Sequence, residues 1–554
     1  MTPAPGGAAG VAPVTIGSDE PLSLDDLLAV ARHGRRVALA DGVAERLGPS
    51  REWVEGLFVG EGAGVGEGDG AAAHGVVGRP VYGVNTGFGA LAGEGAYRDR
   101  GSAAELSRRL VLSNACGTGA ELDQEVVRAA LAIRAASLTN GLSGVPSELP
   151  ATLAAMLNAG VVPVVPEYGS LGASGDLIPL AHVALVATRP PEGPDEPAQS
   201  GTALHAGERK PGLDAMRDAG IERLALGPKD GLALLNGTSF STALAALALA
   251  DALALVEHAE LAVALSAQAL LGFADAFLEQ IHAARGHAGQ IRSAQRLREL
   301  LLGSRLIDGA AERDPVRHPP QDAYSIRCAP QVHGAARDVL SFVQATVATE
   351  LRATTDNPLI VCDLPRSLKA VSGGNFHAEP LAFASDFTTI AVTEVASISE
   401  RRLARMVDPA LSRGLPAMLI DGEQPGLDCG FMLPQYLAAA LVSDCKTLAH
   451  PDSVDSIPTS ANQEDHVSMA MNAGRHARQA VRNATTVIAL ELHAAAQAVD
   501  LRVREPGRGI ADLSPATRAA YERIRSVVDF QTRDELLHPR VEAVRELVVS
   551  GELL

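Results

Sequence analysis

Apolar residues recur at helical spacing along much of the chain. The i, i+3, i+4 pattern predicts helices over residues 103–112, 124–138 and 149–158. Longer runs rich in Ala and Leu, with few charges, follow at residues 238–281, 332–351, 383–405 and 463–501. Helices that are apolar on several faces are typical of the interior of a bundle, and no β-alternation of comparable length is present. We therefore expect an all-α fold built on a long-helix bundle.

The same pattern suggests four parts. Residues 1–20, rich in Gly, Ala and Pro without a basic or apolar stretch, predict a flexible tail and not a signal peptide. Residues 21–235 form an N-terminal domain, residues 236–500 the central bundle, and residues 501–554 short C-terminal helices. A Gly-rich segment, residues 60–78, indicates a loop or insertion.

One uncharged stretch, residues 231–250, approaches the length needed to span a membrane. It contains Asn236, Gly237 and Thr238 and is bracketed by Asp230 and Asp251. These polar residues favour a buried helix entered through a turn. We therefore expect a cytoplasmic protein with no membrane partner.

Composition narrows the classes of function. The chain has 47% hydrophobic and only 3% aromatic residues, so its core must consist mostly of Ala, Leu and Val. A net charge of −19 argues against nucleic acid as a partner, since phosphate binding needs a basic face. The five cysteines are scattered, without Cys-x-x-Cys spacing, which indicates neither a disulfide framework nor a zinc site.

The most informative candidate chemistry lies at Ala173-Ser174-Gly175. Asp176 can cap a helix and Pro179 is tolerated in its first turn, so the three residues are predicted on a tight loop before a helix. There the Gly175 nitrogen can attack the Ala173 carbonyl. Loss of two waters, including the Ser174 hydroxyl, leaves a five-membered ring with an exocyclic methylidene, a strong electrophile. By itself, Ala-Ser-Gly is also the sequence of an ordinary turn.

Seven sequence blocks, which occur in order along the chain, favour the reactive loop over the ordinary turn. The sequence resembles the family of histidine, phenylalanine and tyrosine ammonia-lyases and the related aminomutases, which carry this methylidene-imidazolone (MIO) group. The matching blocks are YGVNTGFG (82–89), GSLGASGD (169–176), GLALLNGT (231–238), QDAYSIR (321–327), TDNPL (355–359), GGNFHAEP (373–380) and SVDSIPTSANQEDHVSM (453–469). The last block, together with Val111-Leu112-Ser113, is most similar to the histidine branch.

The resemblance implies a mostly helical homotetramer with active sites built from several subunits. It also implies a reaction that needs neither a metal nor pyridoxal phosphate. The chain has only four lysines, none in a recognisable Schiff-base setting, which agrees with the second expectation.

Roles for single residues follow from the matched blocks. Tyr82 is the candidate base for the β-hydrogen. A tyrosine has an ordinary pKa of about 10, so its site would have to favour phenolate, and its neighbouring glycines fit a mobile lid. Arg327 is expected to hold the substrate carboxylate in a bidentate contact, with Tyr324 one helical turn away.

The remaining roles are also implied by the resemblance. Asn236 is expected beside the prosthetic group and the carboxylate, although it can equally cap a helix before Gly237. Gln321 and Gln463 are expected as polar neighbours of the site. Phe376 is expected to pack against the prosthetic ring.

Three positions depart from the histidine branch. Asn114 stands where a His usually follows Val-Leu-Ser, and Asp444 stands where a Glu usually follows Ser. The resemblance implies that Asn114 binds the substrate side chain and that Asp444 takes part in catalysis by assisting proton movement. Asn can hydrogen-bond an imidazole but cannot titrate, and Asp is one methylene shorter than Glu. His333 replaces a residue that is usually apolar.

The sequence therefore favours deamination of an aromatic L-amino acid, with L-histidine to urocanate preferred. A 2,3-aminomutase or a lyase for another amino acid such as tyrosine or phenylalanine stays open. So does a non-catalytic helical scaffold, although such a protein would not need Tyr82, Ser174, Asn236, Tyr324 and Arg327 together.

Overall fold

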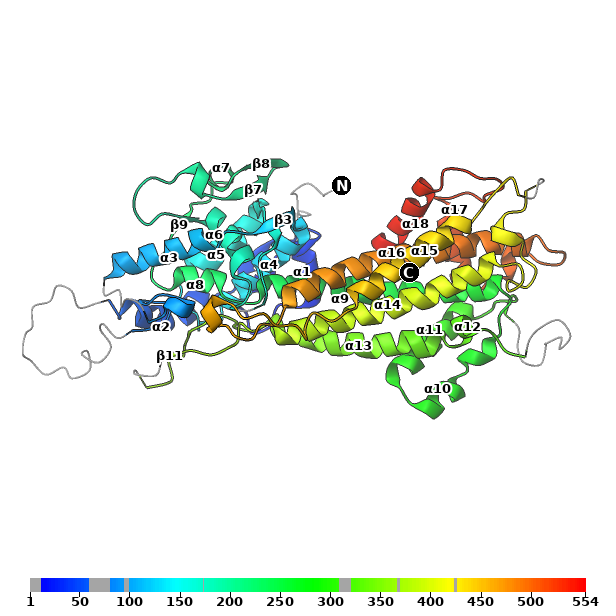
Figure 1. Cartoon of the computed structure of the whole chain (residues 1–554), viewed down its shortest axis with the longest axis horizontal. Helices are drawn as coiled ribbons and strands as arrows, with labels where there is room; N and C mark the ends of the chain where they lie inside the picture. Colours follow the sequence, from blue (N-terminus) through cyan, green and yellow to red (C-terminus); the bar gives the residue numbers. More distant parts are fainter. Residues whose placement is uncertain are drawn as a thin grey trace, which may run out of the picture. The chain divides into compact units, whose positions relative to one another are not determined.

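The computed structural model of the chain is shown in Figure 1. It describes residues 11–58, 80–93, 99–172, 174–307, 320–365, 369–422 and 426–554. The predictions for the insertion at residues 60–78, for residues 1–10 of the N-terminal tail and for Ala173 lie outside these residues. The chain divides into two compact units. Unit 1 comprises Met1–Leu247, Ala345–Ala384 and Pro451–Arg475, and unit 2 comprises Ala248–Gln344, Ser385–His450 and His476–Leu554.

Unit 1 is a cluster of short helices with small sheets at its margins. Its helix α4 packs against α1 and α5, while α3, α6 and α8 pack against one another. Eleven of the 15 side chains of α4 are buried, and six of these are Ala or Val, which lets its neighbours approach closely. The helices are α1 (Leu24–Ala31), α2 (Val43–Glu55), α3 (Arg100–Asn114), α4 (Gln124–Leu138), α5 (Glu148–Ala159), α6 (Leu177–Ala187), α7 (Gly212–Asp218) and α8 (Asp230–Leu235).

The strands of unit 1 are two to four residues long. Parallel pairs join β1 (Val14–Ile16) to β2 (Val37–Leu39) and β6 (Thr188–Arg189) to β9 (Leu224–Ala225). The other pairings are antiparallel: β3 (Thr118–Glu121) with β5 (Pro166–Tyr168), β4 (Val162–Pro163) with β7 (Thr202–His205), β7 with β8 (Glu208–Pro211), and β10 (Leu359–Ile360) with β11 (Ala370–Val371). They tie loops together and leave the fold mostly helical, as predicted.

Four long helices correspond to the four predicted apolar runs, and each contributes residues to both units: α9 (Ser239–Ala269), α13 (Ala329–Glu350), α14 (Glu379–Val407) and α16 (Ala470–Val503). Two predicted ends were wrong. Helix α9 ends at Ala269, not at residue 281, because Leu271 takes a left-handed φ of +52° and Gly272 bonds back to Ala267. Helix α16 begins at Ala470, not at residue 463.

Unit 2 holds its share of these helices together with buried charge. Glu491 on α16 accepts two hydrogen bonds from Arg402 on α14, at 2.6 and 2.7 Å, and one from Ser266 on α9. Ser399 donates a fourth. The Arg402 and Glu491 side chains are fully buried. The remaining helices of unit 2 are α10 (Glu279–Arg285), α11 (Ala288–Leu301), α12 (Tyr324–Arg327), α15 (Met432–Leu448), α17 (Pro515–Arg525) and α18 (His538–Ser550).

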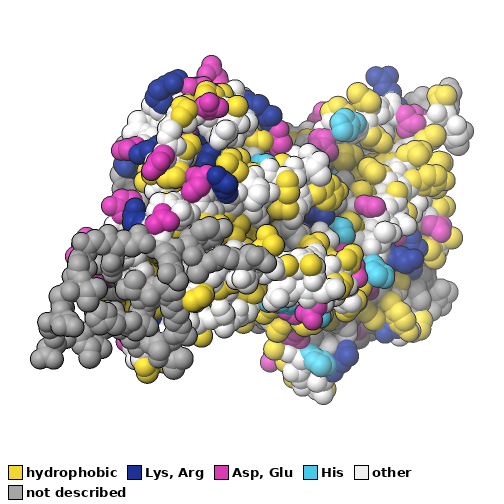
Figure 2. Space-filling model, turned by 60° about the vertical axis from the view of Figure 1, so that its left-hand side comes forward, with side chains coloured by type: hydrophobic (Ala, Val, Ile, Leu, Met, Phe, Trp, Pro, Cys, Tyr) yellow, Lys and Arg dark blue, Asp and Glu magenta, His cyan; other side chains and the backbone are white. Residues whose placement is uncertain are grey.

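Two of the described helices, α9 and α14, are long and apolar enough to cross a membrane by length and composition. Within the most apolar window of each, 78% and 67% of the residues are buried inside the protein. The uncharged stretch at residues 231–250 is thus the end of α8, a polar turn and the start of α9, as expected. On the face that Figure 2 shows, Lys and Arg side chains are interspersed with Asp and Glu and do not gather into one field.

Candidate active site

The Ser174 loop connects β5 to α6 in unit 1. Two consecutive residues, Ser174 (φ +48°) and Gly175 (φ +74°), take left-handed conformations, which turn the backbone sharply before the helix. A Cβ on Gly175 would lie 2.3 Å from the Gly237 carbonyl oxygen, so only glycine fits there. Gly175 and Gly237 form a short parallel bridge, and the Asp176 N–H donates to the Gly237 oxygen at 2.7 Å. The tight loop before a helix is as predicted.

Asp176 is the N-cap residue of α6, but its carboxylate does not cap that helix. It accepts instead from Ser170 Oγ at 2.7 Å and from the N–H and hydroxyl of Ser241, both at 2.8 Å, in the first turn of α9. Burial raises the pKa of Asp176, and these donors oppose that shift. The carboxylate therefore fastens the Ser174 loop to a second helix, a role that local sequence does not reveal.

Asn236 ends α8 and faces the loop from the other side. Its Nδ2 donates a short hydrogen bond to the Ser174 carbonyl oxygen, while its Oδ1 is buried with no hydrogen-bond partner among the described residues. The alternative role as an N-cap was wrong, since Asn236 follows α8 and α9 begins only at Ser239.

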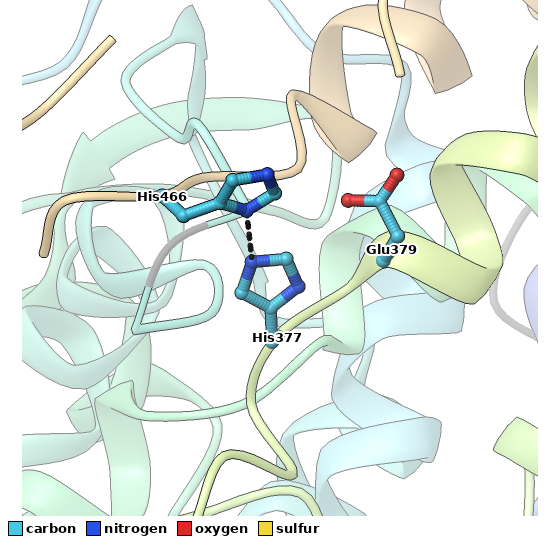
Figure 3. A group of neighbouring side chains, drawn as sticks. All are labelled: His377, Glu379 and His466. Carbon is cyan, nitrogen blue, oxygen red and sulfur yellow. Dashed lines mark hydrogen bonds between the residues drawn. The ribbon is translucent and has the colours of Figure 1, made fainter. Parts of the chain in front are cut away.

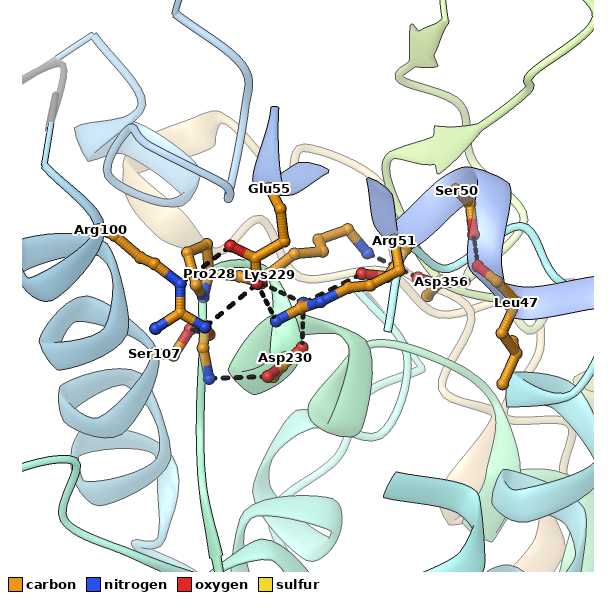
Figure 4. Close-up of polar contacts among 12 residues, drawn as sticks. Leu47, Ser50, Arg51, Glu55, Arg100, Ser107, Pro228, Lys229, Asp230 and Asp356 are labelled. Atoms are coloured by element: carbon orange, nitrogen blue, oxygen red, sulfur yellow. Dashed lines mark hydrogen bonds and ion pairs between the residues drawn. The ribbon is translucent and has the colours of Figure 1, made fainter. Parts of the chain in front are cut away.

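Buried ion pairs fix the start of α8 (Figure 4). Arg51 donates to Asp230 at 2.8 Å, and Lys229 donates to Asp356 at 2.7 Å with both side chains fully buried. Ser143 supplies a second donor to Asp356 at 2.9 Å. Because α8 has only six residues, these contacts at its beginning also position Asn236 at its end.

Arg134 lies behind the turn that Asn236 and Gly237 form. Its Nη1 donates to the Asn236 carbonyl oxygen at 2.9 Å, and a Cβ on Gly237 would lie 2.1 Å from that nitrogen. Its Nε and Nη2 are buried without a partner among the described residues. Burial lowers the pKa of Arg134, and Asp356 and Asp176 counter it. A buried guanidinium therefore supports the Asn236–Gly237 turn, which contacts the Ser174 loop.

A cavity of about 410 Å³ opens over the loop, entirely within unit 1. Its lining brings together four predicted site residues from four separate segments: Tyr82, Asn114, Ser174 and Asn236. Apolar side chains complete the wall, among them Phe88, Leu106, Leu110, Leu177 and Leu232. An apolar pocket with a few convergent polar groups is typical of a small-molecule site.

Tyr82 does not have the environment that was expected for a base. Burial raises its pKa, and nearby Glu464 adds to that effect, whereas the N–H of Gly89, which donates to the phenol oxygen at 3.1 Å, lowers it. The ring packs edge-on against Phe88 with centroids 6.4 Å apart. The described surroundings of Tyr82 therefore favour the neutral phenol.

Glu464 is a site residue that the sequence analysis missed. Its Oε1 accepts from Ser174 Oγ at 2.7 Å, and its Oε2 accepts from Thr459 Oγ1 at 2.9 Å. The neighbouring Gln463, which was predicted, is exposed. Three left-handed residues, Ser460, Ala461 and Asn462, reverse the chain between Thr459 and Gln463. This turn directs Glu464 inward.

Three further predicted residues of unit 1 are Asn114, Phe376 and Gln463. Asn114 is the last residue of α3, and its Nδ2 donates to the Leu110 carbonyl oxygen at 2.7 Å. Phe376 is half-buried in the segment that leads into α14. Neither Phe376 nor Gln463 contributes to the lining of the cavity.

Unit 2 carries Gln321, Tyr324 and Arg327. Gln321 and Arg327 line a second cavity of about 250 Å³. The Arg327 guanidinium lies 4.5 Å from the centre of the Tyr324 ring, which is 69% exposed, and its Nε donates to the Asp322 carbonyl oxygen at 2.9 Å. Asp322 in turn pairs with Arg413 at 2.7 Å. The short helix α12 is therefore tied to the preceding Asp322, and its tyrosine is exposed.

Asp444 also lies in unit 2, exposed on α15, where it accepts from Asn483 at 2.8 Å. His333 is fully buried on α13, and neither ring nitrogen has a partner among the described residues. Burial lowers the pKa of His333 well below its ordinary value. It is a neutral core residue.

The sequence model of the aromatic amino acid lyase family matches residues 22–526 of this chain. The chain belongs to the aromatic amino acid lyase family. It is 49% identical to the histidine ammonia-lyase of Geobacillus kaustophilus, over 84% of this chain and 87% of that protein. The family recognised from the seven blocks is thereby confirmed.

Solved structures of the family agree. The tyrosine aminomutase of Streptomyces globisporus matches with a TM-score of 0.86 at 34% identity, over 98% of both chains. The histidine ammonia-lyase of Trypanosoma cruzi matches with a TM-score of 0.83 at 35% identity, over 98% of this chain and 94% of that one. The predicted mostly helical fold and the predicted class of enzyme, a carbon–nitrogen lyase, are both confirmed.

Within this family fold, Glu464 lies one residue from the predicted Gln463 in the last matched block. The signal that could have pointed to it is its type, since a carboxylate can accept a proton and the amide of Gln463 cannot. Residue type does not tell which of two neighbours points inward. That depends on the left-handed turn before them.

Proposed function

We propose that this protein eliminates ammonia from an aromatic L-amino acid, with L-histidine as substrate and urocanate as product, by means of an MIO group formed from Ala173, Ser174 and Gly175. The observation that carries the proposal is the Ser174 loop. It is left-handed, held by Asn236 and Gly237, and opens into an apolar cavity.

The residues present fit such a group. Gly175 has a conformation and surroundings that only glycine tolerates. Because glycine has no side chain, its nitrogen is little hindered for ring closure. Asn236 donates to the Ser174 carbonyl oxygen, and Glu464 accepts from the hydroxyl that must leave as water. Once formed, the group supplies an electrophile for the substrate and makes its nitrogen a better leaving group.

Tyr82 and Glu464 are the side chains that can move a proton in this cavity. Elimination requires a base to take the β-hydrogen while the bond from the α-carbon to nitrogen breaks. Because burial raises its pKa, Tyr82 needs a positive charge nearby to act as that base, and a substrate ammonium supplies one. Glu464 is positioned to receive a proton at Ser174.

Substrate binding is proposed to use both polar and apolar surfaces. The Oδ1 of Asn236, which has no partner among the described residues, can accept from an ammonium group. Phe88 and the leucines of the wall exclude water, and Asn114 can bond an imidazole. Arg327 can form a bidentate contact with the carboxylate.

We propose that the protein is a cytoplasmic homotetramer in which neighbouring copies complete each site. The sequence resemblance supports this assembly, since it implies sites built from several subunits. Gln321, Tyr324, Arg327 and Asp444 then reach the cavity from other copies. The exposed Tyr324 ring and its Arg327 neighbour fit such a role.

A 2,3-aminomutase is the second candidate, favoured by the match to a tyrosine aminomutase structure. It would use the same loop but return the nitrogen to the β-carbon. The two functions differ in how long the cavity stays closed, and the products tell them apart.

The test has two arms. The intact mass should be about 36 Da, or two waters, below the encoded value. Incubation with L-histidine, L-tyrosine and L-phenylalanine should give ultraviolet absorbance of an unsaturated acid with histidine only. A full encoded mass in active protein contradicts the MIO proposal. Turnover of another amino acid alone contradicts the substrate, and a β-amino acid product establishes the aminomutase.

A further inference from the structure

Two histidines and a glutamate meet in unit 1 outside the lining of the cavity (Figure 3). The potential ligand atoms of His377, Glu379 and His466 all lie within 4.8 Å of one another. Nε2 of His377 and Nδ1 of His466 lie 3.4 Å apart in a long hydrogen bond, whose donor depends on the tautomers. His466 is exposed and the other two are half-buried, so the cluster is accessible to ions in solution.

The donor set and its spacing suit a transition-metal dication. Imidazole nitrogen and carboxylate oxygen are ordinary ligands of zinc, and two nitrogens bound at about 2.0–2.1 Å to one tetrahedral ion lie about 3.4 Å apart. A direct N–H hydrogen bond is shorter, at about 3.0 Å. The histidine pair thus has the separation of two zinc ligands, and a Glu379 carboxylate oxygen lies within 4.8 Å of both nitrogens.

The cluster joins two segments that hold the Ser174 loop. The N–H of Ala378, between His377 and Glu379, donates to the Gly172 carbonyl oxygen at 3.4 Å. From the other segment, Ser468 Oγ donates to the same oxygen at 3.3 Å, and the Met469 N–H donates to the Leu171 oxygen at 2.6 Å. Both segments therefore form hydrogen bonds to the backbone of Leu171 or Gly172, just before Ala173.

We propose that His377, Glu379 and His466 bind a zinc-type dication, which clamps these two segments and stiffens the loop that carries Ser174. The expectation that the reaction needs no metal concerns the cavity and is unaffected, because the ion would lie outside it. The site has three protein ligands and leaves a fourth position to water. The proposal does not depend on which amino acid the enzyme uses.

The first experiment measures binding directly. Full-length protein stripped by dialysis against a chelator is titrated with Co²⁺ and Zn²⁺. We expect one Co²⁺ per chain with a visible ligand-field band and without the near-ultraviolet charge-transfer band of thiolate ligands. His377→Gln and His466→Gln should each weaken binding at least about tenfold, and Glu379→Gln should weaken it less.

Matched controls separate this site from other ligands. His33→Gln removes an exposed histidine elsewhere in unit 1, and Cys116→Ser removes an exposed thiol. Both should bind like the unchanged protein. Circular dichroism and molecular size must be the same for all variants. Equal Co²⁺ affinity in the unchanged protein and in the doubly substituted protein, His377→Gln with His466→Gln, overturns the site.

The second experiment tests the clamp by hydrogen exchange of the backbone at residues 169–180. Saturation with Zn²⁺ should slow this exchange at least severalfold in the unchanged protein and leave it unaltered in His466→Gln. Binding of one ion without any change in exchange overturns the clamp. Neither readout uses substrate, so failure here is distinguishable from failure of the proposed reaction.

Discussion

Two buried polar clusters, one in each unit, differ in how completely their polar atoms are hydrogen-bonded. In unit 2, each oxygen of Glu491 is occupied by donors from Arg402, Ser266 and Ser399, all on regular helices. In unit 1, the Ser174 loop is left-handed at two residues, and Arg134 and Asn236 keep buried polar atoms without partners among the described residues.

The difference separates structural polarity from reactive polarity. A fully paired cluster fixes how helices meet and has no capacity left for a ligand. A cluster with unused donors and acceptors costs free energy in the fold, since unsatisfied buried groups are expensive. Such a cost is expected where the groups act on a bound molecule. Substitutions in the Ser174 cluster should therefore change activity, and substitutions in the Glu491 cluster should change stability.

The largest effect is expected at Ser174. Ser174→Ala removes the hydroxyl whose loss creates the electrophile, so activity should fall by at least about 10³-fold. The deficit of about two waters in the intact mass should shrink or vanish. The melting temperature should change by no more than about 2 °C, because no packed group is lost.

Ser113→Ala serves as the control for that experiment, because Ser113 lines the same cavity. It should keep activity within about tenfold of the unchanged protein. If Ser174→Ala retained substantial activity, the reactive cluster would not be the Ser174 loop, and the contrast between the two units would fail.

The second effect tests the paired cluster. Arg402→Ala leaves the Glu491 carboxylate buried without its guanidinium and should lower the free energy of unfolding by about 3–5 kcal/mol. Replacing both residues with methionine removes the two charges together and should recover much of that loss. Urea denaturation followed by circular dichroism measures both. A single substitution as stable as the unchanged protein contradicts a structural role for this pair.

The sequence predicts the long stretches of helix better than the loops that form the site. Helices α4 and α5 lie where the apolar spacing places them, and α13 and α14 fall within a few residues of their predicted runs. Such periodicity reflects which face of a helix is buried, and it can be read from residues that are close in the sequence. The ends of α9 and α16 were missed because they depend on left-handed residues and tertiary contacts, at Leu271 and in the loop before Ala470.

The same limit applies to the site. Tyr82, Asn114, Ser174 and Asn236, which the sequence resemblance named, line one cavity. The sequence blocks could not show that Asp176 binds Ser241 on another helix, or that burial raises the pKa of Tyr82. They also did not distinguish Glu464 from Gln463. Each of these depends on how remote segments meet.

The third effect is a pH dependence in unit 2. Burial lowers the pKa of His493 from its ordinary value of about 6.5 to about 3, and Arg525 and Arg540 add to the shift. Between about pH 6.5 and pH 3, His493 is therefore protonated in the unfolded chain and neutral in the folded protein. Stability from this group is complete above about pH 6.5 and is lost as the pH falls toward about 3, by about 2 kcal/mol between pH 7 and pH 5.

Urea denaturation at pH 7, 6 and 5 measures this dependence. His493→Leu should flatten it, so that its difference in stability from the unchanged protein shifts by about 2 kcal/mol over that range. The exposed His538 offers a control, since His538→Leu should leave the pH dependence as it is. A difference that stays constant with pH would show that His493 does not titrate on unfolding.

The smallest effect is expected at the rim of the cavity, at Asn114. This residue ends α3, and a histidine at a helix C-terminus is stabilised in its protonated form by the helix dipole. Asn114→His would thus add a titratable donor where relatives of the histidine branch carry one, and should raise kcat/KM for L-histidine by about 3-fold to 10-fold, or about 0.7–1.4 kcal/mol. Asn114→Ala, which removes the amide, should lower it. Stability should hardly change in either variant, because Asn114 is only half-buried. If Asn114→His instead lost activity on histidine while activity on another amino acid persisted, this part of unit 1 would be adapted to a different side chain, although the Ser174 loop beneath it would keep its role.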